Sequence, residues 1–165
     1  MALTVVWMRH AKSSWKDQVT DERRELSPRG ERDSKAAGEL LVSRGIGFDL
    51  VIHSPAERAR ATWANILEAG VKAAEEREDV TLYEGDADEI VKLVAHSGGS
   101  TVLVIGHYPT IPQAVQLAAA RESTKKWAAF DLKFPTSALA FVEAASGEAL
   151  IDTKGRLTDF VIPRG

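Results

Sequence analysis

The stretch Leu3–His10, LTVVWMRH, decides the fold class, because a continuous apolar run leads directly into an arginine and a histidine. A short run of this kind is typical of a strand that is covered on both faces, as in a parallel sheet. Arg9 and His10 then lie at the carboxyl end of a buried strand. Since open α/β sheets bind ligands at that edge, polar residues at other strand ends are candidates for a shared site.

Strands and helices alternate along the remaining sequence, and Ser27-Pro28 and Ser54-Pro55 indicate two helix starts. We expect strands at 3–8, 49–53, 80–83 and 101–105, and a hairpin-linked pair at 138–143 and 149–152. We expect helices from Ser27 to Gly45 or Gly47, from Ser54 to Gly70, and at 86–96 and 111–120. This order predicts a three-layer α/β/α sandwich with a mostly parallel mixed sheet.

Four segments fall outside this alternation. We interpret 17–26 and 75–79 as surface connections, 121–126 as a rim or loop, and 158–165 as an edge strand or a docked tail. The whole chain, 165 residues, fits one domain with one sizeable core, so we expect a single domain over residues 1–165.

The composition excludes several function classes. The formal net charge is -3, so no bulk attraction to nucleic acid or to an anionic membrane surface is expected. Cysteine is absent from the sequence, which excludes disulfides, thiolate metal sites and cysteine nucleophiles. The first apolar stretch is too short for a signal peptide, and no run approaches the ~18 apolar residues of a membrane helix. We therefore expect a cytoplasmic protein.

Three of the expected strands end in residues that suit an anion. The first ends in Arg9 and His10, and the second ends at His53, about one helical turn before Arg58. The fourth ends in Gly106-His107. If these strands lie side by side, their carboxyl ends bring two arginines and two histidines to one crevice.

A phosphoryl group is the anion that this set suits best. A phosphate carries about two negative charges near neutral pH, and an arginine binds it through a planar fork of donors that stays charged. A histidine with a pKa near ~6.5 is largely neutral at that pH and can form a covalent intermediate that water hydrolyses. A second histidine, when protonated, can donate to the phosphoryl oxygens in the transition state.

Three motifs together resemble the histidine phosphatase superfamily: Arg9-His10-Ala11, SPAERARAT at 54–62, and VIGHYP at 104–109. The match spans nearly the whole chain, and the short length without an inserted cap resembles the SixA-type phosphohistidine phosphatase branch. The resemblance implies a phosphoglycerate-mutase-like fold with His10 as the phosphorylated nucleophile. It implies that Arg9, Arg58 and His107 hold the phosphoryl group. It also implies a metal-independent phosphohydrolase, with no cofactor, that acts on protein phosphohistidine.

The proton donor is the least determined part of the expected site. Ester-cleaving branches of the superfamily keep a glutamate just after the third strand, and Glu84 matches that position, with Asp86 and Asp88 as nearby substitutes. We therefore name Glu84 beside His10 as a candidate catalytic residue. A phosphohistidine can react without such an acid, because a ring nitrogen that is already protonated leaves easily. If Glu84 is the proton donor, the alternative function is that of a small-molecule phosphomonoesterase. A non-catalytic phosphoryl-binding regulatory module is a further alternative.

Some features bear on specificity and partners. Ala11 and Tyr108 stand where the family commonly has glycine and asparagine, and Tyr108 is expected to change the rim of the pocket. Lys12, Ser13 and Ser14 either contact the phosphate or the leaving group, or only solvate their loop. The four histidines show no metal-ligand spacing, so no metal is expected. The expected partner is a phosphohistidine-bearing protein domain or a small phosphate ester, with no nucleic acid and no membrane.

Overall fold

The computed structural model describes residues 2–165. Within these residues one mixed sheet has the strand order β3-β2-β4-β1-β5-β6. The strands are β1 (Leu3–Arg9), β2 (Phe48–His53), β3 (Ala73–Glu78), β4 (Thr101–Gly106), β5 (Leu139–Ala144) and β6 (Arg156–Val161). The neighbours β3, β2, β4 and β1 run parallel, whereas β5 and β6 are antiparallel to their neighbours. The sheet is therefore mostly parallel and mixed, as expected.

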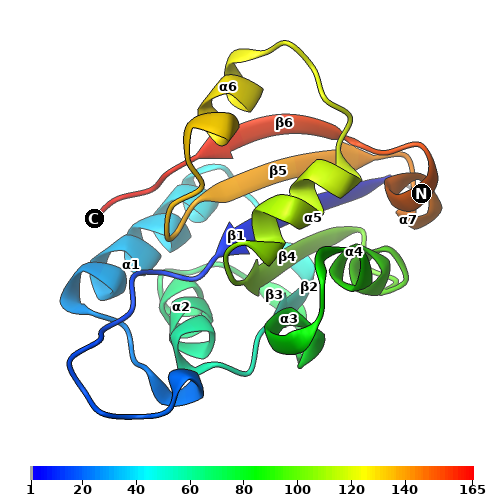
Figure 1. The fold of residues 1–165 in the computed structure, drawn as a ribbon. Coiled ribbons are helices and arrows are strands. Elements are labelled where there is room, and N and C mark those ends of the chain that lie inside the picture. Colours follow the sequence, from blue (N-terminus) through cyan, green and yellow to red (C-terminus); the bar gives the residue numbers. More distant parts are fainter. Residues whose placement is uncertain (1) are drawn as a thin grey trace.

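Helices cover both faces of this sheet. They are the 3-10 turn η1 (Asp21–Arg23), α1 (Pro28–Ser43), α2 (Glu57–Glu68), α3 (Thr81–Glu84), α4 (Ala87–Ala95), α5 (Thr110–Ala118), α6 (Lys125–Leu132) and α7 (Gly147–Asp152). Figure 1 shows α1 and α2 on one side of the sheet and α4 and α5 on the other. This arrangement confirms the three-layer α/β/α sandwich.

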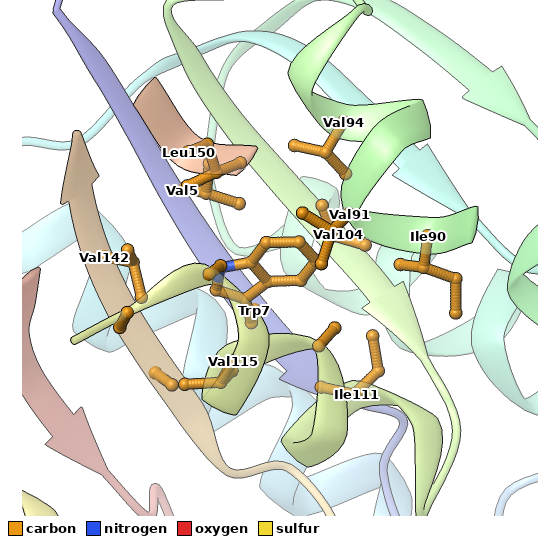
Figure 2. Close-up of a cluster of buried hydrophobic side chains, with 14 of the residues drawn as sticks. Val5, Trp7, Ile90, Val91, Val94, Val104, Ile111, Val115, Val142 and Leu150 are labelled. Atoms are coloured by element: carbon orange, nitrogen blue, oxygen red, sulfur yellow. The ribbon is translucent and has the colours of Figure 1, made fainter. Parts of the chain in front are cut away.

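The alternation of side chains along β1 builds both core layers. Val5 and Trp7 point to the layer of α4, α5 and α7, where Figure 2 shows the Trp7 ring among aliphatic side chains. Val6 and Met8 point to the opposite layer, against α1 and α2. All four side chains are fully buried, which explains why this strand is apolar without interruption.

The third strand lies earlier in the chain than the sequence predicts. Residues 80–83 were expected as a strand, but Thr81–Glu84 form the short helix α3, which buries Leu82. The strand is β3, within the charged run that we expected to be a connection, and it pairs with β2 at the edge of the sheet. Charged side chains are common on edge strands because they discourage further pairing, so the polar composition concealed this strand.

The C-terminal region also differs from the expected hairpin. Residues 149–152 belong to the helix α7, whose N-cap Ser146 accepts a hydrogen bond from the Ala149 N–H, and not to a strand. The antiparallel partner of β5 is β6, which confirms the edge-strand alternative for the start of segment 158–165. The rim segment 121–126 leads into α6, which the sequence analysis did not predict.

Candidate active site

A cavity of about 510 Å³ opens at the carboxyl ends of the parallel strands. Its lining residues are Arg9, His10, Lys12, Ser13, Trp15, Asp21, Arg24, Arg58, Tyr83, His107, Tyr108 and Thr136. The structure thus brings together four of the five residues expected at the site: Arg9, His10, Arg58 and His107. The fifth, Glu84, is exposed and is not among the lining residues.

Backbone hydrogen bonds fix the end of β1 at the floor of the cavity. The His10 N–H donates to the Gly106 carbonyl at 2.9 Å, which ties the ends of β1 and β4 together. The Ser137 N–H lies 3.1 Å from the Arg9 carbonyl oxygen and 3.2 Å from that of His10. The Ala11 N–H donates to the Thr62 hydroxyl of α2 at 3.0 Å. The chain around His10 is therefore held from both sides.

The hydrogen bonds of the His10 imidazole leave one ring nitrogen without a proton. Its Nδ1 lies 2.7 Å from the Ala11 carbonyl oxygen, which can only accept, so Nδ1 carries the proton and Nε2 carries the lone pair. That lone pair faces the Arg58 Nε–H at 3.3 Å. His10 is only 6% exposed, and burial, with smaller contributions from the charges of His107 and Arg58, lowers the pKa of His10 to about 3. His10 is consequently neutral at pH 7, as attack on phosphorus requires.

The Arg58 guanidinium occupies the centre of the site. Its Nη1 donates to the Asp21 carbonyl at 2.7 Å, and its Nη2 donates to Asp21 Oδ2 at 3.0 Å. The same Nη2 lies 3.3 Å from His107 Nδ1. Arg58 thus bridges both histidines and one carboxylate, and a bound phosphoryl group would compete with these acceptors for its donors.

His107 is held by Ser54, at the end of the neighbouring strand. Because Arg58 Nη2 donates to His107 Nδ1, the proton of the neutral ring lies on Nε2, which is 2.7 Å from the Ser54 hydroxyl oxygen. Burial, and secondarily the charge of Arg58, lowers the pKa of His107 to about 4. The helix α2 begins later than the predicted start at Ser54: its N-cap is Ala56, and the Ser54 hydroxyl accepts from the Ala56 N–H.

Arg9 adds a second cation to the pocket. Its Nη1 donates to the Phe134 carbonyl at 3.1 Å, while its buried Nε has no hydrogen-bond partner among residues 2–165. The guanidinium carbon lies 5.0 Å from the centre of the Tyr108 ring, at cation–π distance. Tyr108 itself is 58% exposed, so it forms part of the rim, as the sequence predicts.

The segment 17–26, expected as a surface connection, supplies two lining residues that the sequence analysis missed. Asp21 Oδ1 accepts from Arg24 Nε at 3.1 Å, and Asp21 Oδ2 accepts from the Tyr83 hydroxyl at 2.7 Å. Partial burial alone would raise the pKa of Asp21, but hydrogen bonds from Tyr83, Arg58 and Arg24 outweigh it and lower the pKa to about 2. No local pattern distinguishes Asp21 from the neighbouring acids, because two of its three partners, Tyr83 and Arg58, come from distant segments.

The residues that follow the nucleophile line one wall of the cavity. Ser13 accepts a hydrogen bond from Arg24 Nη1 at 2.7 Å, and both Lys12 and Ser13 are lining residues, whereas Ser14 is not. The Lys12 carbonyl packs against Gly30 of α1, where an added Cβ would approach its oxygen to 2.0 Å. Gly30 therefore permits the close contact that places this wall.

The three acids considered as proton donors have other environments. Glu84 is exposed at the end of α3, Asp86 caps α4 by accepting from the Glu89 N–H, and Asp88 pairs with Lys92 at 2.8 Å. None of the three lines the cavity. The role of Glu84 stays a prediction, which the substrate test below addresses.

Among residues 2–165 there is no cluster of three or more histidine, cysteine, aspartate or glutamate side chains suited to a metal ion. In the same range, none of the helices has the length and apolar composition needed to span a bilayer.

The buried histidines make folding stability depend on pH. Because the folded pKa values of His10 and His107 lie near 3 and 4, the unfolded chain takes up protons below pH ~6.5 that the folded chain does not. The free energy of unfolding is therefore expected to fall as the pH drops from 7 to 5, with a slope approaching ~1.4 kcal/mol per pH unit for each histidine. Urea unfolding at several pH values measures this slope. The variant His10→Asn should show a smaller dependence of this free energy on pH. A slope equal to that of the wild type would contradict the low pKa assigned to His10.

Comparisons with known proteins agree with this geometry. A model of the histidine phosphatase superfamily (branch 1) matches residues 5–91. An uncharacterised protein of Mycobacterium leprae is 35% identical over 167 aligned residues, which cover 95% of this chain and 100% of that protein. A solved structure named "Putative Phosphohistidine Phosphatase SixA", from Nakamurella multipartitia, is 30% identical and aligns with a TM-score of 0.84 over 99% of this chain and 97% of that chain. A phosphoglycerate mutase of Plasmodium falciparum, 16% identical, aligns with a TM-score of 0.62 over 99% of this chain and 93% of that chain, which confirms the expected fold class.

Proposed function

Since the chain belongs to the histidine phosphatase superfamily (branch 1), we propose that it is a metal-independent phosphohydrolase that works through a phosphohistidine at His10. One observation carries the proposal. The unprotonated Nε2 of a buried, neutral His10 faces into a cavity that Arg9, Arg58 and His107 also line. We propose that these three side chains hold the phosphoryl group, and that residues 1–165 act as one catalytic domain located in the cytoplasm.

The first step transfers the phosphoryl group to the enzyme. The Nε2 lone pair of His10 forms a bond to phosphorus as the bond to the leaving atom breaks, and that electron pair stays with the leaving group. The Arg58 Nε–H, which points at Nε2 from 3.3 Å, moves to a phosphoryl oxygen when the lone pair is used. The Ala11 carbonyl accepts from Nδ1–H and stabilises the positive charge that the ring then carries.

The second step returns the enzyme to its starting state. A water molecule attacks phosphorus, the bond to Nε2 breaks, and its electron pair returns to the imidazole of His10. The proton lost by water ends on the released phosphate or its surroundings. Arg9 and Arg58 neutralise charge on the phosphoryl oxygens throughout, and a His107 that takes up a proton near the bound anion adds a donor at Nδ1.

We propose protein phosphohistidine as the substrate. Its leaving group is an imidazole, which departs without an acid when its other nitrogen is protonated. The proposal fits the exposed position of Glu84, the carboxyl on which the ester alternative depends. The rim residue Trp15 is 74% exposed and Tyr108 is 58% exposed, so the mouth of the cavity has large side chains free to contact a protein surface.

The substrate class is tested by comparing two phosphate donors in the presence of a chelator. We expect release of phosphate from a phosphohistidine-bearing peptide, and the variant Glu84→Gln should retain it within about twofold, because Glu84 does not line the cavity. Slower turnover of an aryl phosphate ester is expected, equally independent of Glu84.

Ester turnover that falls by the 10²–10⁴-fold of a lost general acid in Glu84→Gln would instead assign the protein to the small-molecule phosphomonoesterases. Release from neither donor, with phosphate still bound, would favour the non-catalytic binding module.

A further inference from the structure

Asp21 is placed in the phosphoryl site although it is not one of the groups that would hold the phosphoryl oxygens. Its carboxylate accepts from Arg58 at 3.0 Å, from Arg24 at 3.1 Å and from the Tyr83 hydroxyl at 2.7 Å. Two distant elements, α2 and α3, thus meet this one side chain, and Arg24 of its own segment adds a third donor. Such convergence fixes the carboxylate at the wall of the cavity, where it faces whatever binds there.

The charges of the cavity make this position unusual. Among its lining residues in the described chain, Arg9, Lys12, Arg24 and Arg58 are cationic, and Asp21 is the single acid. A site that only had to bind a phosphate dianion would be served better without a carboxylate, because like charges repel. Arg58 would still donate to the Asp21 carbonyl, its other acceptor on this residue, if the carboxylate were absent.

Depth within the cavity places Asp21 on the side of the leaving group. His10, at the floor, is 6% exposed, while the Asp21 side chain is 49% exposed. In-line transfer to His10 Nε2 directs the leaving atom away from the floor and toward the mouth. The more exposed Asp21 carboxylate lies toward that mouth, on the path along which the leaving group departs.

The leaving group of phosphohistidine differs in charge from that of an ester. A phosphoimidazole that is protonated on its free ring nitrogen carries a positive charge, which it loses when the bond to phosphorus breaks and the electron pair stays on the ring. A phosphate ester carries no such positive charge, whereas the phosphoryl group of either substrate carries about two negative charges near neutral pH. An ionised carboxylate repels the phosphoryl group of either substrate and of free phosphate, but only the cationic leaving group of phosphohistidine offsets this repulsion by its attraction to the carboxylate.

We propose that Asp21 is a specificity-determining residue, which selects phosphohistidine over phosphate esters and over free phosphate by attracting a protonated imidazole. The inference rests on the proposed function of the site and specifies its substrate preference. It assigns the segment 17–26 a part in recognition, beyond its packing against Arg58. The step itself is unchanged: the bond from phosphorus to the substrate nitrogen breaks, the bond to His10 Nε2 forms, and the substrate leaves as neutral imidazole.

The test compares Asp21→Asn with Glu22→Gln, a neighbouring exposed acid that lies outside the cavity lining and loses the same charge. For Asp21→Asn we expect kcat/KM on a phosphohistidine-bearing peptide to fall about tenfold while inorganic phosphate, as a competitive inhibitor, binds about three- to tenfold more tightly. Aryl ester turnover should rise relative to peptide turnover. Glu22→Gln should change neither quantity.

A fall in peptide turnover combined with a rise in phosphate affinity distinguishes substrate recognition by Asp21 from mere positioning of Arg58. If Asp21 only positioned Arg58, its loss would weaken peptide turnover and phosphate binding together, and that result would overturn the inference, as would no change in either. Phosphate affinity is measured by calorimetry and needs no turnover. A wild-type protein without activity on the peptide would overturn the proposed function and this inference with it, whereas the calorimetry would still report the effect of the carboxylate on phosphate.

Discussion

Replacing His10 by asparagine is expected to abolish phosphate release, with a loss of roughly 10⁴-fold or more, because removal of a nucleophile leaves only binding and electrostatic contributions. The asparagine amide can still donate toward the Ala11 carbonyl, but it has no basic lone pair in place of Nε2. The cavity and its cations remain, so inorganic phosphate should still bind. Steady-state phosphate release and calorimetric phosphate binding measure the two properties on the same preparation.

A matched control for this variant is His96→Asn. His96 is an exposed residue at the C-cap of α4 and does not line the cavity. The variant His96→Asn also loses an imidazole, and it should keep full activity. Substantial phosphate release by His10→Asn would show that another group attacks phosphorus, and the account of the site would then be wrong.

Arg58→Ala is expected to have the second largest effect, on binding of the phosphoryl group. Each hydrogen bond to a charged group contributes ~1.5–3 kcal/mol, so each lost bond should raise the Kd for inorganic phosphate about tenfold or more. The loss also leaves Asp21 with one fewer cationic partner and thus increases repulsion of the phosphate. Both phosphate binding and turnover should therefore fall.

Arg60→Ala is the control on the same helix. The Arg60 side chain is 50% exposed, pairs with Glu78 and does not line the cavity. The variant Arg60→Ala removes an arginine side chain two positions along the helix from Arg58, and it is expected to leave the Kd for phosphate unchanged. Equal losses in Arg58→Ala and Arg60→Ala would indicate a general effect of helix charge, and would contradict a direct contact between Arg58 and the phosphoryl group.

The meeting of Arg9, His10, Arg58 and His107 could be predicted because it follows from a general property of parallel sheets. Three of these residues come at or directly after the carboxyl end of β1 or β4, and Arg58 lies in the first turn of α2, which follows β2. The strands β1, β4 and β2 are adjacent, so their ends meet. The apolar run before Arg9 indicated a strand buried on both faces. The structure confirms that burial in both core layers.

The parts that could not be predicted depend on contacts between distant segments. β3 is a strand because its backbone pairs with β2, although its side chains are charged. The pairing of Asp21 with Tyr83 joins residues 62 positions apart, and its pairing with Arg58 joins residues 37 positions apart. No local pattern encodes such pairings, which explains why the segment 17–26 seemed to be only a connection. The exposed position of Glu84 likewise follows from the helical turn α3, where a strand was expected.

The central claim, a phosphohistidine at His10, is tested most directly by trapping the phosphorylated enzyme. Protein quenched rapidly in alkali during turnover of a phosphohistidine-bearing peptide is digested, and its fragments are examined by mass spectrometry. Phosphohistidine survives alkali and is lost in acid, so the account predicts one added phosphoryl group on His10 that disappears after acid treatment and is absent from His10→Asn. Turnover without any phosphoryl group on His10, or the same modification in His10→Asn, would contradict it.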